Sequence, residues 1–404
     1  RALVIVFAYT AYFAHAQPGQ IDINRVGLMH NMPTPYSMRN WKSITLKYDS
    51  FVYNLNATGQ YLPLMHLKPN GVNYSSIQPI LFDSYVGSAS SGSQAEAINI
   101  IPSLVGASLV GIDKSNQFGN NWVLKSKDFF NKANGQNIYL NGYSATSGND
   151  WWYDVMPNVF FYQLYSLYPT TADFQTQFTT VADRWLSAVQ AMGGTTTPWK
   201  LPQMNYRAFN FSTMSPVSGG WSEPEAAGAI GWLLYQAYQQ TGQRKYLDGA
   251  QMAIGYLASL TSNPAYEIQL PYGTFTAAKM NAELGTNYNI TKMINWSFDQ
   301  SSVRNWGTIV GTWGDAVTGM NDVSGLIGEV DNPNTGYAFA MNGFQQAAAL
   351  VPLVKYDKRF ARTVAKWVLN MANASRMYYR PYLPSSHQDG YLWSSANDPQ
   401  AIIG

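Results

Sequence analysis

Helix-length segments joined alternately by short and long connections constrain this 404-residue chain more than any other feature. Short joints at 168–169, 241–242 and 355–357 alternate with long ones at 80–93, 134–150, 193–222, 261–273 and 299–336. The pattern predicts helical hairpins whose long loops all lie at one end, over the N-termini of the more apolar helices. Strand-like alternation is scarce, and apolar residues recur at helical spacing in 41–54, 94–110, 121–131, 151–167, 171–192, 223–241, 243–260, 274–284, 290–298, 337–354 and 357–373.

Such hairpins predict an all-α fold, an (α/α)6 toroid or barrel with two concentric helix layers. Six hairpins need twelve helices, and the segments named above number eleven. We therefore expect a last helix or a further C-terminal domain to lie beyond Gly404. No composition shift marks an internal boundary. We therefore expect three parts: a secretory signal peptide at 1–16, an extended lead-in at 17–40 and a toroid domain at 41–404.

The first residues are typical of a secretory signal. Ala2 to Phe13 form an apolar run too short to span a bilayer, and the following AHA fits a cleavage site. A retained N-terminal helix is the alternative. Charged residues make up 12% of the chain, the net charge is +2 and no charged run occurs, so nothing indicates nucleic acid or an electrostatic membrane partner. We expect a secreted, periplasmic or cell-envelope protein without a membrane span.

The stretch 219–238, GGWSEPEAAGAIGWLLYQAY, predicts a buried helix. Ser222 and Glu225 have capping-box spacing, and Pro224 suits a first turn. The small and apolar residues that follow leave no polar face, which is typical of a helix packed on all sides. Glu225 is explained by the cap. Glu223 is either an ordinary first-turn acid or a carboxylate that faces a cleft.

The entry WSEPEAAGAIGWLLYQAYQQTGQRKYLDGA, the loop NDWWYDVMPNVFFYQL and the paired helices resemble six-hairpin (α/α)6-toroid carbohydrate-active enzymes. The resemblance covers the architecture of residues 40–404. It implies a cleft for a sugar polymer at the N-termini of the inner helices. In hydrolases of this fold two carboxylates usually perform the chemistry, and in lyases a set of Tyr, His, Asn or Arg does so.

Three acids are the candidate catalytic residues, and the chain has only 23 acids from which to choose. Glu223 is one. Asp150 directly precedes Trp151 and is either a helix N-cap or a cleft residue, and Asp154, one turn later, has a weaker claim. Asp315 lies in the longest loop, and such loops are often functional. The sequence does not decide whether Asp150 or Asp315 is the partner of Glu223.

Aromatic rings stack on the apolar faces of sugars, although buried tryptophans more often belong to a core. The candidate substrate-binding residues are Trp151, Trp152, Trp221, Tyr272, Trp306, Trp313 and His387. We expect no cofactor. Asp322, Glu329 and Asp331 offer oxygens to Ca²⁺, but their spacing matches no calcium-binding loop that we can name.

The residues and the resemblance together predict a glycoside hydrolase acting on a glucan-like polysaccharide or oligosaccharide with two carboxylates. The resemblance also implies an inverting outcome. One alternative is a polysaccharide lyase that uses Tyr153, Tyr272, His387 or Arg304, although three histidines after the signal and a near-neutral charge argue against it. The other is a non-catalytic glycan-binding or structural surface protein on the same scaffold.

Overall fold

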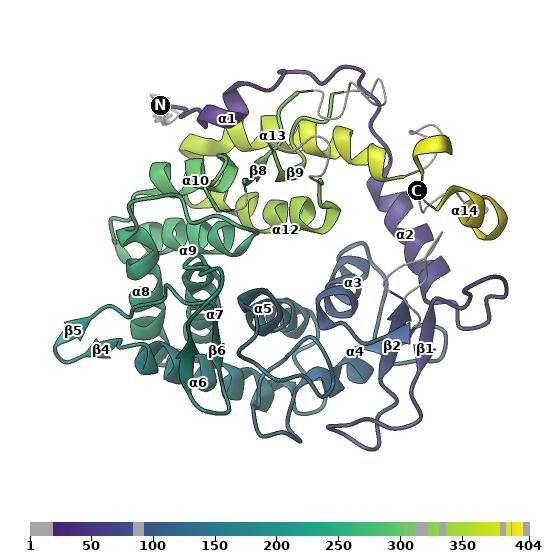
Figure 1. Cartoon of the computed structure of the whole chain (residues 1–404), viewed down its shortest axis with the longest axis horizontal. Coiled ribbons are helices and arrows are strands. Elements are labelled where there is room, and N and C mark those ends of the chain that lie inside the picture. The colour runs from purple at the N-terminus through teal and green to yellow at the C-terminus, as the bar shows by residue number, and fades with distance from the viewer. Residues whose placement is uncertain are drawn as a thin grey trace, which may run out of the picture.

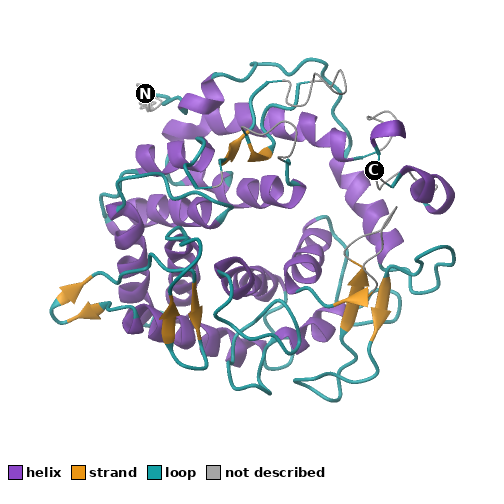
Figure 2. Ribbon diagram, in the orientation of Figure 1, coloured by secondary structure: helices purple, strands orange, loops and turns teal. Residues whose placement is uncertain are grey.

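The structure, a computed structural model, describes residues 19–83, 93–303, 305–311, 322–330, 337–379, 385–388 and 390–398. Most of these residues are helical, and the strands are short, as Figure 2 shows. The predicted all-α class is therefore confirmed. Within the described residues, no helix is both long and apolar enough to cross a membrane. The proposed signal at 1–16 lies outside them, as do Arg304, Trp313, Asp315 and Asp331.

The helices follow one another around the molecule (Figure 1). A first group lies nearer the middle: α3 (Ala97–Leu109), α5 (Trp151–Leu167), α7 (Ala226–Thr241), α9 (Gln269–Leu284) and α12 (Ala340–Leu350). Each member contacts the next, with the most extensive contacts between α7 and α9 and between α3 and α5. A second group lies farther out and packs on the first: α6 (Phe174–Ala191), α8 (Arg244–Ser259), α10 (Ile290–Phe298) and α13 (Ala361–Ala374).

Residues from the two ends of the chain lie beside each other. Helix α2 (Trp41–Val52) reaches both α3 and α12, and the rings of Trp41 and Phe344 are 6.2 Å apart. The lead-in is not wholly extended, because it contains the short helix α1 (Asn24–Gly27), which packs on α10 and α13. Its backbone is tied to the C-terminal part where the N–H of Ile21 donates to the Arg359 carbonyl at 2.8 Å.

The remaining elements are small. They are the helices α4 (Trp122–Lys125) and α14 (Tyr391–Asn397), and the 3-10 turns η1 (Ser126–Phe129), η2 (Pro352–Lys355), η3 (Lys358–Phe360), η4 (Ser375–Tyr378) and η5 (Ser385–His387). Four antiparallel sheets occur among the described residues, formed by β1 (Met65–Leu67), β2 (Ile80–Asp83) and β3 (Ser93–Gln94), by β4 (Thr195–Thr196) and β5 (Trp199–Lys200), by β6 (Ala208–Asn210) and β7 (Ser215–Val217), and by β8 (Trp306–Thr308) and β9 (Ile327–Glu329).

Local signals fix several helix ends. The side chain of Asp150 accepts the N–H of Trp152 at 2.8 Å and so caps α5. Helix α10 is capped in the same way by Asn289, which accepts from Lys292 at 2.9 Å. At the other end, α7 stops at Gly242, whose φ of 69° is a left-handed conformation that favours glycine.

Helix α7 is buried on every face over residues 226–235, as its composition predicts. Its predicted start is wrong, however. The helix begins at Ala226, and the predicted capping box between Ser222 and Glu225 does not form. The Glu225 carboxylate instead accepts backbone N–H groups at the start of α9, from Glu267 at 3.0 Å and from Leu270 at 3.2 Å. The glutamate therefore joins two helices rather than closing its own.

Candidate functional site

Acidic side chains gather where three consecutive helices of the first group begin. Asp150 precedes α5, Glu223 and Glu225 precede α7, and Glu267 precedes α9. Helix α7 packs on both α5 and α9, so these three N-terminal ends are neighbours. These acids lie at or near the ends of three of the long connections that the sequence predicts at this end of the molecule.

A single arginine holds two of the acids together. Arg207 lies just before β6, and its backbone N–H donates to the Val217 carbonyl at 2.9 Å across the β6–β7 hairpin. Its Nη1 donates to Oε1 of Glu223, and its Nη2 donates to Oδ2 of Asp150. Because both nitrogens belong to one planar guanidinium, the two carboxylates lie side by side.

The members of this ion-paired triad differ in exposure. The Arg207 side chain is 26% exposed and that of Asp150 is 19% exposed, whereas that of Glu223 is 1% exposed. Solvent, and a substrate, can thus reach Asp150. The buried Glu223 carboxylate is placed to orient the Arg207 guanidinium. The structure brings together Glu223 and Asp150, two of the three predicted catalytic residues.

The backbone of Tyr206 sets the spacing of the triad. Its carbonyl accepts the indole N–H of Trp151 at 2.7 Å and the backbone N–H of Glu223 at 3.0 Å. The first residue of α5 and the loop before α7 are therefore fastened to one point. Trp151 is fully buried, so its role is to hold the loop rather than to face a ligand.

Glu225 is a buried acid between helices. Its side chain has no exposed surface, and burial raises the pKa of its carboxyl to about 7, although the N–H groups of Glu267, Leu270 and Gln269 oppose the rise. Proton uptake by this group is therefore coupled to the junction of α7 and α9. No local pattern indicated this role of Glu225, because its partners lie more than forty positions away.

Two further acids favour the protonated form. Burial raises the pKa of the Glu267 carboxyl well above its usual range, the charges of Glu225, Glu223 and Asp150 add to the rise, and Arg207 opposes it. Burial also raises the pKa of Asp154 well above normal, although its Oδ2 accepts the Gly148 N–H at 2.8 Å.

The site thus combines ion-paired carboxylates with carboxyls whose pKa is raised by burial, and acid–base catalysis uses groups of both kinds. Sequence reasoning gave Asp154 a weak claim and missed Arg207 and Glu267. The signal for Glu267 was its place in the long connection 261–273, at the same end as the other acids. No local signal marked Arg207.

Exposed aromatic rings stand near these acids in the sequence. Trp221, two positions before Glu223, is 60% exposed, and Tyr153, in the first turn of α5, is also exposed. Tyr337 and Phe339, directly before α12, are exposed as well. Trp221 is the one predicted sugar platform among the described side chains whose ring is open to solvent.

Other predicted substrate-binding rings are buried, and stacking on a sugar does not fit their surroundings. Trp152 and Trp306 are almost fully enclosed, and Trp306 packs edge-on against Tyr266 and Tyr337. Tyr272 falls inside α9, which begins earlier than predicted. Its hydroxyl donates to Gln345 and accepts from Gln163, which ties α9 to α12 and α5.

Several predictions lie outside the described part of the chain. They concern Asp315 as a catalytic residue and Trp313 as a platform. His387 lies in η5, and its side chain is not among those described. No group of three or more His, Cys, Asp or Glu suited to a metal ion occurs among the described residues. Asp322 accepts hydrogen bonds from the backbone and hydroxyl of Ser324.

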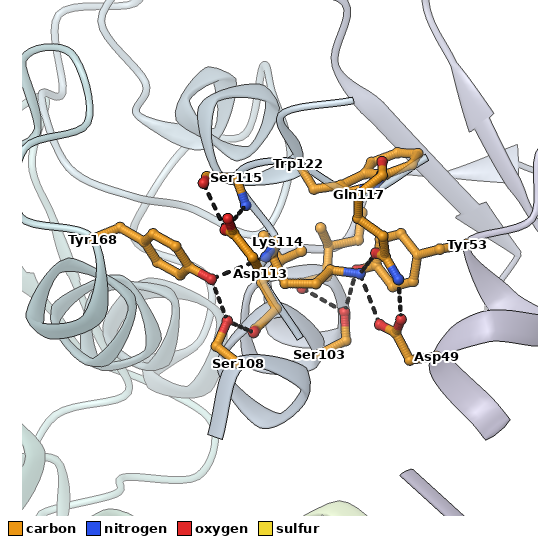
Figure 3. Close-up of polar contacts among 12 residues, drawn as sticks. Asp49, Tyr53, Ser103, Ser108, Asp113, Lys114, Ser115, Gln117, Trp122 and Tyr168 are labelled. Atoms are coloured by element: carbon orange, nitrogen blue, oxygen red, sulfur yellow. Dashed lines mark hydrogen bonds and ion pairs between the residues drawn. The ribbon is translucent and has the colours of Figure 1, made fainter. Parts of the chain in front are cut away.

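A second charged cluster, which the sequence did not reveal, is structural. Lys114 is fully buried and donates to Asp49 at 2.7 Å and to Gln117, and its ammonium lies 3.0 Å from the centre of the Tyr53 ring (Figure 3). Burial lowers the pKa of Lys114 to about 8, and Asp49 opposes that change. The ammonium has polar partners and no access to solvent, so it fastens α2 to the segment after α3.

A cavity of about 550 Å³ lies between α6, α8 and the β4–β5 hairpin. Its charged lining residues, Lys245 and Asp248, are each paired with a neighbour, Asp183 and Arg244 respectively. It contains no group with the properties of the acids around Arg207. We therefore place the candidate active site at the N-terminal ends of α5, α7 and α9.

Comparison of the chain with models of known families, with curated proteins and with solved structures finds no match. The functional argument therefore rests on the chemistry of the residues around Arg207.

Proposed function

We propose that the protein is a glycoside hydrolase that acts on a glucan-like polysaccharide or oligosaccharide. The observation that carries the proposal is the convergence of Asp150 and Glu223 on Arg207, beside Glu267, the pKa of whose carboxyl is raised by burial. Hydrolysis of a glycosidic bond needs a carboxylate that activates water and a carboxylic acid that protonates the leaving oxygen. Groups of both kinds occur together here.

The proposed scaffold is an (α/α)6 toroid. The succession of contacts from α3 through α5, α7 and α9 to α12, with α2 between α12 and α3, supports a closed inner layer. In such a layer the N-termini of the inner helices share one end. The acids and the exposed aromatic rings lie before these helices, and the proposal places the polymer along them.

In this proposal Asp150 is the base that activates water, because it is the accessible member of the triad. The ion pair with Arg207 fixes the direction of its carboxylate. Glu223 holds Arg207 in place. Trp221 offers a ring face to a sugar next to the acids. We propose an inverting outcome, and secretion or export to the cell envelope, as further parts of this hypothesis.

The lyase alternative has less support. A lyase must neutralise the carboxylate of a uronate with a cation, and both terminal nitrogens of Arg207 already bind acids. Tyr272, one of its predicted groups, is buried and hydrogen-bonded. A non-catalytic glycan-binding protein would keep the aromatic rings but would have no use for protonated acids in the same place.

The test is a panel of neutral and acidic polysaccharides incubated with the native protein and with Asp150→Asn, Glu223→Gln and Trp221→Ala. New reducing ends are measured, and proton NMR gives the anomeric form released first. We expect hydrolysis of a neutral glycan by the native protein and a loss of at least about 100-fold in Asp150→Asn. Trp221→Ala should mainly weaken substrate binding.

Asp248→Asn is the matched control, because this acid pairs with Arg244 on α8 and lies away from the triad. Its activity should equal that of the native protein. Unsaturated products that absorb ultraviolet light would favour a lyase. Retention on a polysaccharide without any product would favour a binding protein. Full activity in both Asp150→Asn and Glu223→Gln would reject the proposed site.

A further inference from the structure

Glycosidic cleavage needs a proton donor that a substrate can reach. Three described acids at the site have a pKa raised by burial: Asp154, Glu225 and Glu267. Asp154 is buried and bound to the Gly148 N–H. Glu225 is fully buried, and each of its oxygens accepts a backbone N–H. Neither acid is free to meet a substrate.

Glu267 differs from both. The residue is only half-buried, and its Oε2, which is enclosed, has no hydrogen-bond partner among the residues that the structure describes. A carboxylate oxygen left in such a position is costly unless it carries a proton or meets a donor. The backbone of Glu267 is fixed, because its N–H donates to Glu225 at 3.0 Å. The backbone of Glu267 is therefore held in place, while its Oε2 has no hydrogen-bond partner among the described residues.

Building on the proposed hydrolase function, we infer that Glu267 is the proton-donating acid and that Asp150 is its base partner. The groups facing Glu267 come from each neighbouring connection: Asp150 before α5, Glu223 and Glu225 before α7, and Arg207 from the β6–β7 hairpin. The three acids favour a proton on Glu267. The one cation of this set is held by two of the acids, which limits its opposing effect.

The step balances as follows. The proton of Glu267 passes to the glycosidic oxygen as the bond from that oxygen to the anomeric carbon breaks, and the leaving group departs as an alcohol. Water forms the new bond to the anomeric carbon, and its proton passes to Asp150. Exchange with solvent then returns a proton to Glu267 and removes one from Asp150. One water is consumed and no other reactant is needed.

The decisive variant is Glu267→Gln, which keeps the size of the side chain and the backbone N–H. We measure it on the polysaccharide that the native protein hydrolyses and on the dinitrophenyl glycoside of its sugar, whose leaving group needs no proton. On the polysaccharide we expect kcat to fall by about 100- to 10,000-fold, the usual contribution of a general acid. On the dinitrophenyl glycoside we expect a fall of less than about 10-fold.

The pH profile gives a second readout. The native protein should lose activity on the polysaccharide as pH rises past the pKa of the acid, and Glu267→Gln should lack this limb. Glu267→Asp, which keeps a proton donor on a shorter side chain, should retain the limb at a lower rate. Asp248→Asn is again the matched control.

Three results would overturn the assignment. Equal losses on both substrates would show a structural role, native activity in Glu267→Gln would show no role, and a retained basic limb would place the acid elsewhere. If Glu267→Gln does not fold, the assignment rests on Glu267→Asp, where loss of the limb would reject it. A native protein inactive on every glycan would instead reject the proposed function itself.

Discussion

Gly228 of α7 lies against the backbone of α9, and Gly228→Ala tests how this close approach builds the site. A Cβ at this glycine would collide with the Gln269 carbonyl oxygen and would lie 3.1 Å from the Gly273 backbone nitrogen. Gly273 faces it from α9, where an added Cβ would lie 2.6 Å from the Cα of Gly228. Both obstacles are backbone, so no side-chain rotation relieves them.

The expected cost follows from this geometry. Carbon atoms pack best at about 3.5–4 Å, so the two helix starts must separate by on the order of 1 Å. Overpacking of this kind usually costs about 1–3 kcal/mol. The separation also stretches the bonds from Glu225 to α9, which contribute about 1.5–3 kcal/mol each when the acceptor is charged. With partial loss of these bonds, we expect Gly228→Ala to lower the free energy of unfolding by about 4 kcal/mol.

Gly106→Ala is the matched control, because this glycine lies inside α3 and no atom lies within 4 Å of its added Cβ. Alanine favours a helix over glycine by about 1 kcal/mol, so this variant should be slightly more stable than the native protein. Both are measured by urea denaturation followed by circular dichroism. If Gly228→Ala loses less than about 1 kcal/mol relative to Gly106→Ala, the close approach of α7 and α9 is not what fixes the site.

Three further predictions concern charged groups. Arg207→Met leaves two acids without their cation and should lower the free energy of unfolding by about 2 kcal/mol, less than for a fully buried pair because the arginine is partly exposed. Measured by denaturation at several pH values, this loss should shrink in acid. A loss that does not depend on pH would contradict the prediction. Lys114→Met leaves the buried Asp49 with the Gln117 amide but without its cation, and should cost about 3–5 kcal/mol. The double variant with Asp49→Leu should recover most of this loss in a double-mutant cycle, and no recovery would show that the pair itself is not the cause. The folded-state pKa of Glu225, about 7, lies above the 4.5 of an ordinary glutamate. Its contribution to stability is therefore complete below pH 4.5 and is lost as pH rises through 7, by on the order of 3 kcal/mol. Glu225→Gln should lack this dependence of unfolding free energy on pH, and a native protein without the dependence would refute the burial argument.

Local sequence signals predicted much of the helical framework. The bounds of α5 and α10 agree with the prediction because Asp150 and Asn289 cap their own helices within three residues. Helix α9 starts earlier than predicted because its first turn is stabilised from another helix, by Glu225. A pattern search along one segment does not contain that partner.

The candidate site was predictable only in part. Glu223 and Asp150 were found because each stands directly before an apolar helix. The burial of Trp151, Trp152 and Trp306 was not predictable. A tryptophan ring can belong to a core or line a cleft, and the sequence does not say which side it faces. Arg207 lies 57 positions from Asp150 and carries no local signal at all.

The sequence by itself determined the helical class, the order of the helices, and the end of the array at which the acids collect, because periodicity and capping act over a few neighbouring residues. Only the tertiary structure decided which acids meet and which of them have a raised pKa. Burial and distant charges set a pKa, and both depend on contacts between segments far apart in the chain, such as those of Arg207 with Asp150 and of Glu225 with α9.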